Sequence, residues 1–365
     1  MGTNHSSRSM RYLLWGVGLL LLPLLLQSIG NGWVRIADMA LLYVLLALGL
    51  NIVVGYAGLL DLGFVAFFAV GAYMFGLLAS PHLTDTFPWI AAMFPGGLHT
   101  PLWAVIPIGA GLAGLFGVLL GAPTLKLRGD YLAIVTLGFG EIIRVFMNNL
   151  DNPVNITNGP KGLGQIDAMT IFGHPLSKRL DLGFMELSGV TLYYYLFLAL
   201  VLVSALICYR LETSRIGRAW MAIREDEIAA KAMGINTRNL KLLAFGMGAT
   251  FGGVAGVMFA SFQGFVSPES FSLMESVMIV AMVVLGGLGH LPGVIMGAVL
   301  LSALPEVLRY VAGPLQAMTD GRLDAAILRQ LLIALAMIII MLWRPRGLWP
   351  APEHGKALPH DKEAA

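Results

Sequence analysis

The sequence predicts an all-α, polytopic membrane protein with about ten transmembrane helices, both chain ends in the cytoplasm, and one cytoplasmic helix between two spans. Of its 365 residues, 57% are hydrophobic and only 12% are charged, whereas a soluble domain carries about 25% charged residues. The apolar residues gather in stretches of about the length that crosses a bilayer. A basic connection, residues 211–241, separates two such stretches, and Lys and Arg near span ends hold a connection in the cytoplasm.

Composition also excludes several classes of function. The net charge of +2 gives no reason to expect nucleic-acid binding. Cys208 is the only cysteine, and the seven histidines lack the spacing of metal ligands, so we expect no disulfide, no metal and no cofactor. The chain has no G-x-x-x-x-G-K-[ST] phosphate loop and no nucleophile beside a base. These absences favour transport over catalysis.

The first two spans begin the chain. Basic residues precede the apolar run Tyr12–Leu26, and no clear small-residue cleavage site follows it, so we interpret the run as a span that starts inside rather than as a signal peptide. Arg35 and Asp38 open the second span. One turn apart on a helix, they are expected to form an interfacial ion pair.

Residues 55–76, GYAGLLDLGFVAFFAVGAYMFG, form the most unusual apolar segment, with five glycines and Asp61. The glycines predict that the first half is not a regular helix. Broken helices are tolerated at membrane depth only where protein or water satisfies the backbone. Asp61 is therefore either a functional group or an acid hydrated near an interface.

The fourth and fifth spans follow an external loop, residues 80–101, that has no Lys or Arg. The fourth, Leu102–Leu120, is followed by the basic residues Lys126 and Arg128, which should be cytoplasmic. The fifth, Tyr131–Asn149, carries Glu141 and Arg144. Three residues apart on a helix, these two side chains are expected to form a buried structural pair.

A long polar loop, residues 150–189, is expected outside, and a sixth span then leads to the basic connection. Within that connection, Ala219–Met233 lacks Gly and Pro and predicts one helix of about four turns, ended by Gly234 in a left-handed cap. Its apolar face contains Ile228 and also Glu225. The helix is either a docking surface for a partner or a surface helix at the lipid headgroups.

Four further spans complete the chain: residues 242–262, 271–289, 292–312 and 325–343. The first of them carries Gly248, Gly252 and Gly256, a spacing that lets helices pack closely. Residues 271–289 are short enough to be re-entrant instead. We expect one transmembrane domain, residues 1–349, and a polar, disordered tail, residues 350–365.

Two kinds of transporter fit these features. A secondary transporter would place its coupling-ion site in a broken helix such as that near Asp61. A membrane subunit moved by another protein would need a cytoplasmic docking helix and few ionisable groups in the membrane. The second fits better, and a membrane-embedded enzyme fits least.

Four segments, GYAGLLDLGFVAFFAVGAYMF, LKLRGDYLAIVTLGFGEIIR, GRAWMAIREDEIAAKAMGIN and QGFVSPESF, occur in this order. Together they resemble the permease subunit of branched-chain amino acid ABC importers, of the LivM type, from about Val34 to Pro350. The resemblance implies an inner-membrane subunit of a bacterial importer. It also implies a LivH-like second permease, two cytoplasmic ATPase subunits and a periplasmic binding protein that delivers leucine, isoleucine or valine. Related permeases serve urea and short-chain amides, which remain an alternative.

The same resemblance suggests which residues carry the function. Permeases of ABC importers have a coupling helix with the pattern E-A-A-x-x-x-G. Ala229, Ala230 and Gly234 match it, whereas the acid is displaced to Glu227, with Glu225 as the other candidate. The candidates for the solute pathway or its gates are Asn51, Asp61, Glu141 and Arg144.

Overall fold

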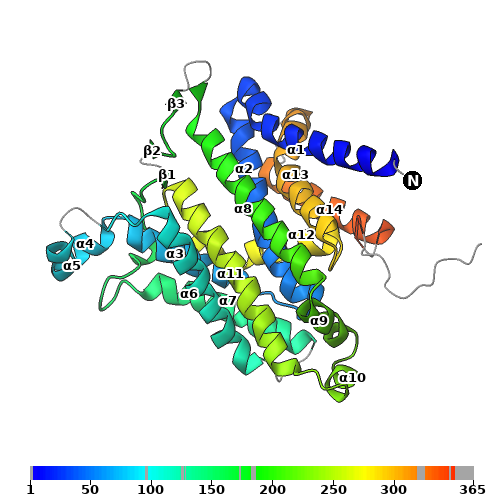
Figure 1. Cartoon of the computed structure of the whole chain (residues 1–365). Helices are drawn as coiled ribbons and strands as arrows, with labels where there is room; N and C mark the ends of the chain where they lie inside the picture. The colour runs from blue at the N-terminus through cyan, green and yellow to red at the C-terminus, as the bar shows by residue number, and fades with distance from the viewer. Residues whose placement is uncertain are drawn as a thin grey trace, which may run out of the picture.

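The computed structural model describes residues 3–94, 98–124, 127, 129–171, 174–181, 186–318, 325–344 and 347–349. This part of the chain is mostly helical (Figure 1). The helices are α1 (Thr3–Ile29), α2 (Asn31–Leu50), η1 (Asn51–Tyr56), α3 (Val65–Ala79), α4 (His82–Thr86), α5 (Pro88–Met93), α6 (Leu102–Thr124), α7 (Asp130–Asn149), η2 (Gly159–Lys161), α8 (Gly189–Glu212), α9 (Arg215–Glu225), α10 (Glu227–Ala232), α11 (Thr237–Gln263), η3 (Pro268–Phe271), α12 (Leu273–Gly286), α13 (Leu291–Met318) and α14 (Ala325–Trp343). Two small hairpins pair β1 (Thr170–Ile171) with β2 (His174–Pro175), and β3 (Leu180–Asp181) with β4 (Glu186–Leu187).

Five helical stretches are long and apolar enough to cross a membrane. They are Asn31–Tyr56, Ala104–Thr124, Gly189–Glu212, Thr237–Gln263 and Leu291–Leu308. Shorter apolar helices accompany them at Gly16–Ile29, Val65–Ala79, Leu273–Gly286 and Ile333–Trp343. Each of the ten spans predicted from sequence overlaps a helix. Nine of these helices are among the long or the shorter apolar helices given above, and the tenth is α7.

The helices of the central bundle run between two ends of the molecule, whereas α1 extends away to the right in Figure 1. In Figure 1 the hairpins lie at the top, the strand end, and α9 and α10 lie at the bottom, the α9–α10 end. Turns that are distant in sequence meet at the α9–α10 end: Gly289 lies beside Arg224, and Trp349 N donates to the carbonyl of Gly286. Lys126 and Arg128, the basic residues predicted for this side after the fourth span, lie outside the described residues, as does the polar tail 350–365.

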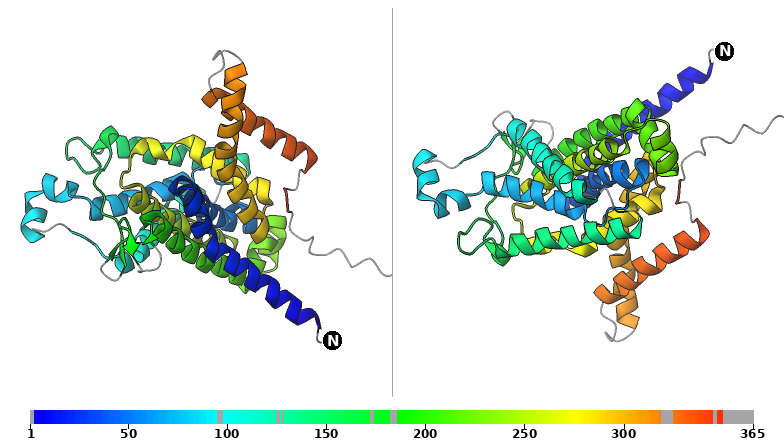
Figure 2. Two further views of the ribbon diagram at one scale, coloured as in Figure 1. Left: turned by 90° about the horizontal axis from the view of Figure 1, so that it is seen from above. Right: turned by 90° about the horizontal axis from the view of Figure 1, so that it is seen from below.

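Helix α11 occupies the centre of the bundle, against α6, α3 and α2. A Cβ added to Gly256 would overlap the carbonyl of Phe68 in α3, and one added to Gly117 would lie 2.5 Å from Cβ of Ala249. The close packing predicted from the glycine spacing is therefore confirmed. Figure 2 shows that α13 and α14, in orange, project from the side of this bundle.

The second span does not continue into the third as a regular helix. Helix α2 ends in the π-helix η1, residues 57–64 follow without regular helix, and α3 begins at Val65. The residue Gly58 takes φ +68°, a conformation that glycine adopts without steric cost. The break predicted from the glycines of residues 55–76 is confirmed.

The structure corrects the prediction of one continuous helix over Ala219–Met233. The chain breaks at Asp226, whose backbone is extended and whose Oδ1 accepts hydrogen bonds from the amides of Ile228 (2.8 Å) and Ala229 (3.1 Å). Asp226 therefore caps a second helix, α10, instead of continuing α9. The left-handed residue that ends the segment is confirmed, since Gly234 has φ +83°.

The ion pair predicted between Arg35 and Asp38 is also wrong. The guanidinium of Arg35 donates to Oε1 of Gln263 at 2.5 Å and lies over the ring of Phe262. Both carboxylate oxygens of Asp38 are buried without a hydrogen-bond partner among the described residues. Arg35 therefore contacts Phe262 and Gln263, at the end of α11, instead of its neighbour in sequence, Asp38.

Candidate functional site

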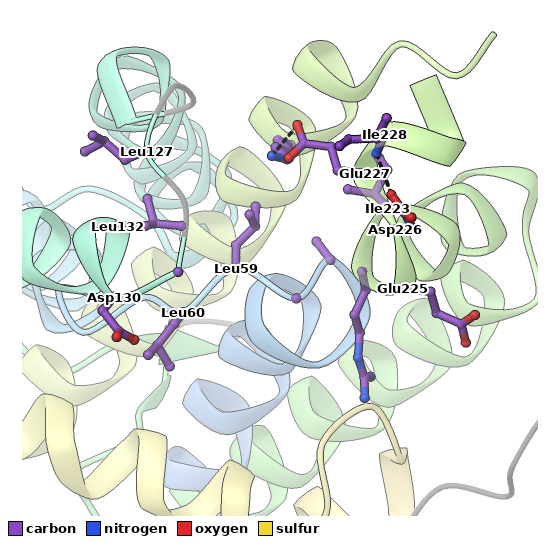
Figure 3. A pocket seen from close by; sticks show the side chains of 15 residues that line it. Leu59, Leu60, Leu127, Asp130, Leu132, Ile223, Glu225, Asp226, Glu227 and Ile228 are labelled. Atoms are coloured by element: carbon purple, nitrogen blue, oxygen red, sulfur yellow. Dashed lines mark hydrogen bonds and ion pairs between the residues drawn. The ribbon is translucent and has the colours of Figure 1, made fainter. Parts of the chain in front are cut away.

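A cleft of about 390 Å³ opens at the α9–α10 end, between α9 and α10 on one side and the connection 57–60, Leu127, Gly129 and the start of α7 on the other (Figure 3). Basic and acidic side chains line it together with leucines and isoleucines. The charged members are Asp130, Arg224, Glu225, Asp226, Glu227 and Lys241. The cleft lies directly beneath the irregular segment that follows η1.

Helix α9 is fixed to the bundle by its buried face. Trp220 is fully buried, and its Nε1 donates to the carbonyl of Leu240 at 2.7 Å. Ile223, one turn on, is also buried. Burial of an indole whose N–H is satisfied stabilises a contact strongly, so α9 should move with the start of α11.

Helix α10 has one anchored side and one open side. The carboxylate of Glu227 lies 2.7 Å from Nζ of Lys241 on α11, and Ala230 is buried. On the open side, Ile228 is 69% exposed and Met233 is 83% exposed. These two large apolar side chains are therefore available for contact with a partner.

The predicted coupling residues therefore divide into two groups. Glu227 and Ala230 face the permease, whereas Glu225, Ala229 and Gly234 are exposed. Figure 3 shows the carboxylates of Glu225 and Glu227 directed to opposite sides of the break at Asp226. The two acids that sequence could not rank are thus in different environments.

Arg224 is a functional candidate that sequence reasoning missed. Its Nη1 donates to the carbonyl of Gly55, at the end of η1, at 2.5 Å. The predicted site residue Asn51 lies at the start of the same π-helix, fully buried, and its Oδ1 accepts from the amide of Gly289 at 3.0 Å. Local sequence gives no signal for these contacts, because Arg224 and Gly55 are 169 positions apart.

Asp61 lies in the interior rather than at a hydrated interface, since it is 1% exposed. Its Oδ1 accepts from the amide of Gly63 at 2.9 Å, and its Oδ2 has no hydrogen-bond partner among the described residues. A cavity of about 10 Å³ adjoins it, lined by Thr136 of α7 and Phe245 of α11 among others. That volume is close to the room one water needs.

Glu141 and Arg144 form the predicted pair, with Nη2 of Arg144 2.9 Å from Oε2 of Glu141. The pair is not buried as expected, because the two side chains are 34% and 28% exposed. Nη1 of Arg144 also lies 3.6 Å from Glu269 in η3. A local pair thus joins α7 to a loop at the strand end.

The four predicted pathway residues do not meet in one site. Asn51 contacts the turn before α13, Asp61 faces α6, α7 and α11, and Glu141 with Arg144 lies nearer the strand end. The described contacts therefore give three separate positions along the bundle. The α9–α10 cleft adjoins the irregular segment 57–60, which lies between Asn51 and Asp61 in the chain.

Comparisons with known proteins cover most of the chain. A family model described as "Branched-chain amino acid transport system / permease component" matches residues 32–342. The high-affinity branched-chain amino acid transport system permease protein LivM of Escherichia coli (strain K12) is 41% identical over 334 residues, which cover 88% of this chain and 71% of that protein. The LivH permease of the same organism is 25% identical over 90% of this chain and 96% of its own length. No solved structure gives a significant match.

Proposed function

This chain belongs to the family of branched-chain amino acid transport system permease components, and we propose that it forms, with a LivH-like second permease, the route by which leucine, isoleucine or valine crosses the bacterial inner membrane. It is a multi-pass membrane permease and not a catalytic subunit. Two cytoplasmic ATPase subunits supply the energy, and a periplasmic binding protein delivers the solute. Similarity to both LivM and LivH over almost the whole chain supports pairing with a second permease of the same fold.

The proposed topology has about ten spans with both termini in the cytoplasm. The connections after η1, α6, α8, α12 and α14 all reach the α9–α10 end, as strict alternation requires. The basic residues of the segment 211–241 support a cytoplasmic position for that end. Residues 1–349 then form one transmembrane domain, with 350–365 as a polar tail outside the described residues.

The observation that carries the proposal is the two-sided arrangement of α10. Ile228 and Met233 are open to a partner, while Glu227 on the other side is tied to Lys241 of the central helix. An ATPase that binds the exposed side would therefore move α11 as well. In this arrangement Glu225, Ala229 and Gly234 contact the ATPase, whereas Glu227 and Ala230 hold α10 to the permease.

The solute pathway follows the outer face of α7. The pair Glu141–Arg144 is partly exposed in the second half of α7, and the neighbouring side chains Ile142 and Val145 are exposed. Charged groups at membrane depth avoid lipid and face a partner or a watery path. Asn51 and Asp61 are buried, so they act as supports of a gate rather than as its lining. Because the binding protein selects the solute, the path itself need only be permissive.

The proposal is tested in proteoliposomes that hold this chain with its candidate second permease, ATPases and leucine-loaded binding protein. We expect leucine uptake that depends on ATP, and loss of uptake with Glu225→Ala or Glu227→Ala in assembled complexes. Leucine uptake by this chain alone, driven by an ion gradient and unchanged in both variants, would instead indicate a secondary transporter.

A further inference from the structure

Arg224 reaches from the cytoplasmic helix α9 to the last turn of the second span. Its Nη1 donates to the carbonyl of Gly55 at 2.5 Å. The last four carbonyls of a helix lack partners within it, and a cation near them is also favoured by the helix dipole. Arg224 therefore satisfies a group that the end of η1 leaves open.

Two glycines shape the space that this side chain occupies. A Cβ at Gly58 would lie 2.7 Å from Cγ of Arg224, and one at Gly289 would lie 2.9 Å from its Nη1. Both glycines have positive φ, +68° and +78°, which other residues adopt at a cost. The main chain thus approaches the aliphatic stem at Gly58 and the guanidinium at Gly289, while the rest of Arg224 stays exposed.

A second contact joins the turn 287–290 to η1. Oδ1 of Asn51, four residues before Gly55 in η1, accepts from the amide of Gly289 at 3.0 Å. The turn connects α12 to α13. Arg224, the end of η1 and this turn therefore form one connected group, which links α9 to the second span and to the connection between α12 and α13.

We propose that Arg224 is the positioning residue that transmits the movement of α9 to the membrane spans. The inference rests on the proposed function, in which ATPases move α9 and α10. When α9 shifts, Arg224 draws the carbonyl of Gly55 with it, and Asn51 carries the displacement on to the turn 287–290. The π-helix is the element that yields, because its backbone hydrogen bonds are already irregular.

The test compares Arg224→Ala and Arg224→Lys with Arg218→Ala in the complete reconstituted transporter. Arg218 is a matched control, since it lies on the same helix and its guanidinium binds only the nearby carbonyl of Thr213 among the contacts described. We measure complex assembly, ATP hydrolysis and leucine uptake per ATP. Arg224→Ala should assemble and hydrolyse ATP, with uptake per ATP lowered about tenfold or more. Arg224→Lys should recover part of the loss, because an ammonium can still donate to Gly55.

Asn51→Ala provides a second variant that keeps Arg224 and removes only the contact with Gly289. It should also lower uptake per ATP, and the double variant should be no worse than the more damaging single one, because both break one chain of contacts. Uptake per ATP in Arg224→Ala equal to that in Arg218→Ala would overturn the inference alone. Failure of both Arg224 variants to assemble, with normal coupling in Asn51→Ala, would show a purely structural role and overturn it too. Absence of ATP-dependent uptake by the native complex would overturn the proposed function together with the inference.

Discussion

Nζ of Lys241 lies 2.7 Å from a carboxylate oxygen of Glu227, across the junction between the buried helix α11 and the partly open helix α10. The lysine side chain is only 6% exposed, so Glu227 supplies a counter-charge where little water reaches the ammonium group. The acid that stands closest to the coupling pattern therefore points into the permease. In the proposed function, Glu225 and the apolar side of α10 are the groups that contact an ATPase.

The first prediction concerns the stability of this junction. Glu227→Gln should lower the free energy of unfolding by about 1–3 kcal/mol, somewhat less than the loss typical of a fully buried pair, since Glu227 keeps a quarter of its side chain exposed. Thermal unfolding in detergent measures the change. Glu225→Gln, at an exposed position two residues earlier, serves as the control and should stay within about 0.5 kcal/mol. Equal effects of the two substitutions would contradict a structural role for Glu227.

The second prediction concerns ATPase binding. Ile228→Asp and Met233→Asp should each weaken co-purification of the ATPases about tenfold or more, because a charge would replace an exposed apolar contact. Ile216→Asp on α9 is the matched change at a less exposed residue and should bind normally. If Ile216→Asp abolishes ATPase binding and the other two variants bind normally, the docking surface lies on α9 instead.

The third prediction concerns the break between α9 and α10. Asp226→Ala removes the acceptor of two amide hydrogen bonds and should cost about 1 kcal/mol of cap stability. Hydrogen exchange at the amides of Ile228 and Ala229 should then speed up about fivefold. Asp226→Asn keeps an acceptor oxygen and should exchange like the native chain. Unchanged exchange in the alanine variant would show that packing alone fixes the break.

The fourth prediction concerns the glycine contacts. A Cβ at Gly71 of α3 would overlap the carbonyl of Gly253 in α11, whereas one at Gly111 of α6 meets nothing within 4 Å. Gly71→Ala should therefore destabilise the bundle by about 1–3 kcal/mol. Gly111→Ala should be neutral or stabilising by up to about 1 kcal/mol. Thermal unfolding of both variants in one detergent tests this, and a Gly71→Ala protein as stable as Gly111→Ala would contradict close backbone packing.

Features with a local cause could be predicted from the sequence. The apolar stretches located the long helices, the glycines of residues 55–76 predicted the break before α3, and the spacing of Glu141 and Arg144 predicted their pairing. Each depends on residues within a few positions of one another. The exposed state of that pair was not predictable, because it depends on what covers α7.

Features with a distant cause were missed. Arg35 binds Gln263, which lies 228 positions away, in place of its neighbour Asp38. The contact of Arg224 with Gly55 likewise needs the fold before it can be seen. Asp226 is a different case, since aspartate commonly caps a helix. Its position inside a run of helix formers concealed that signal.

The central place of α11 has a consequence for the order in which the protein is made. Its packing partners α2, α3 and α6 all end by Thr124, whereas α11 begins at Thr237. During synthesis the early helices enter the membrane before α11 has been made, so their glycine surfaces stay uncovered. They can pack fully only after α11 is synthesised. Chains form from the N-terminus onward, so a truncation before residue 237 should leave an open set of helices, exposed to membrane quality-control proteases.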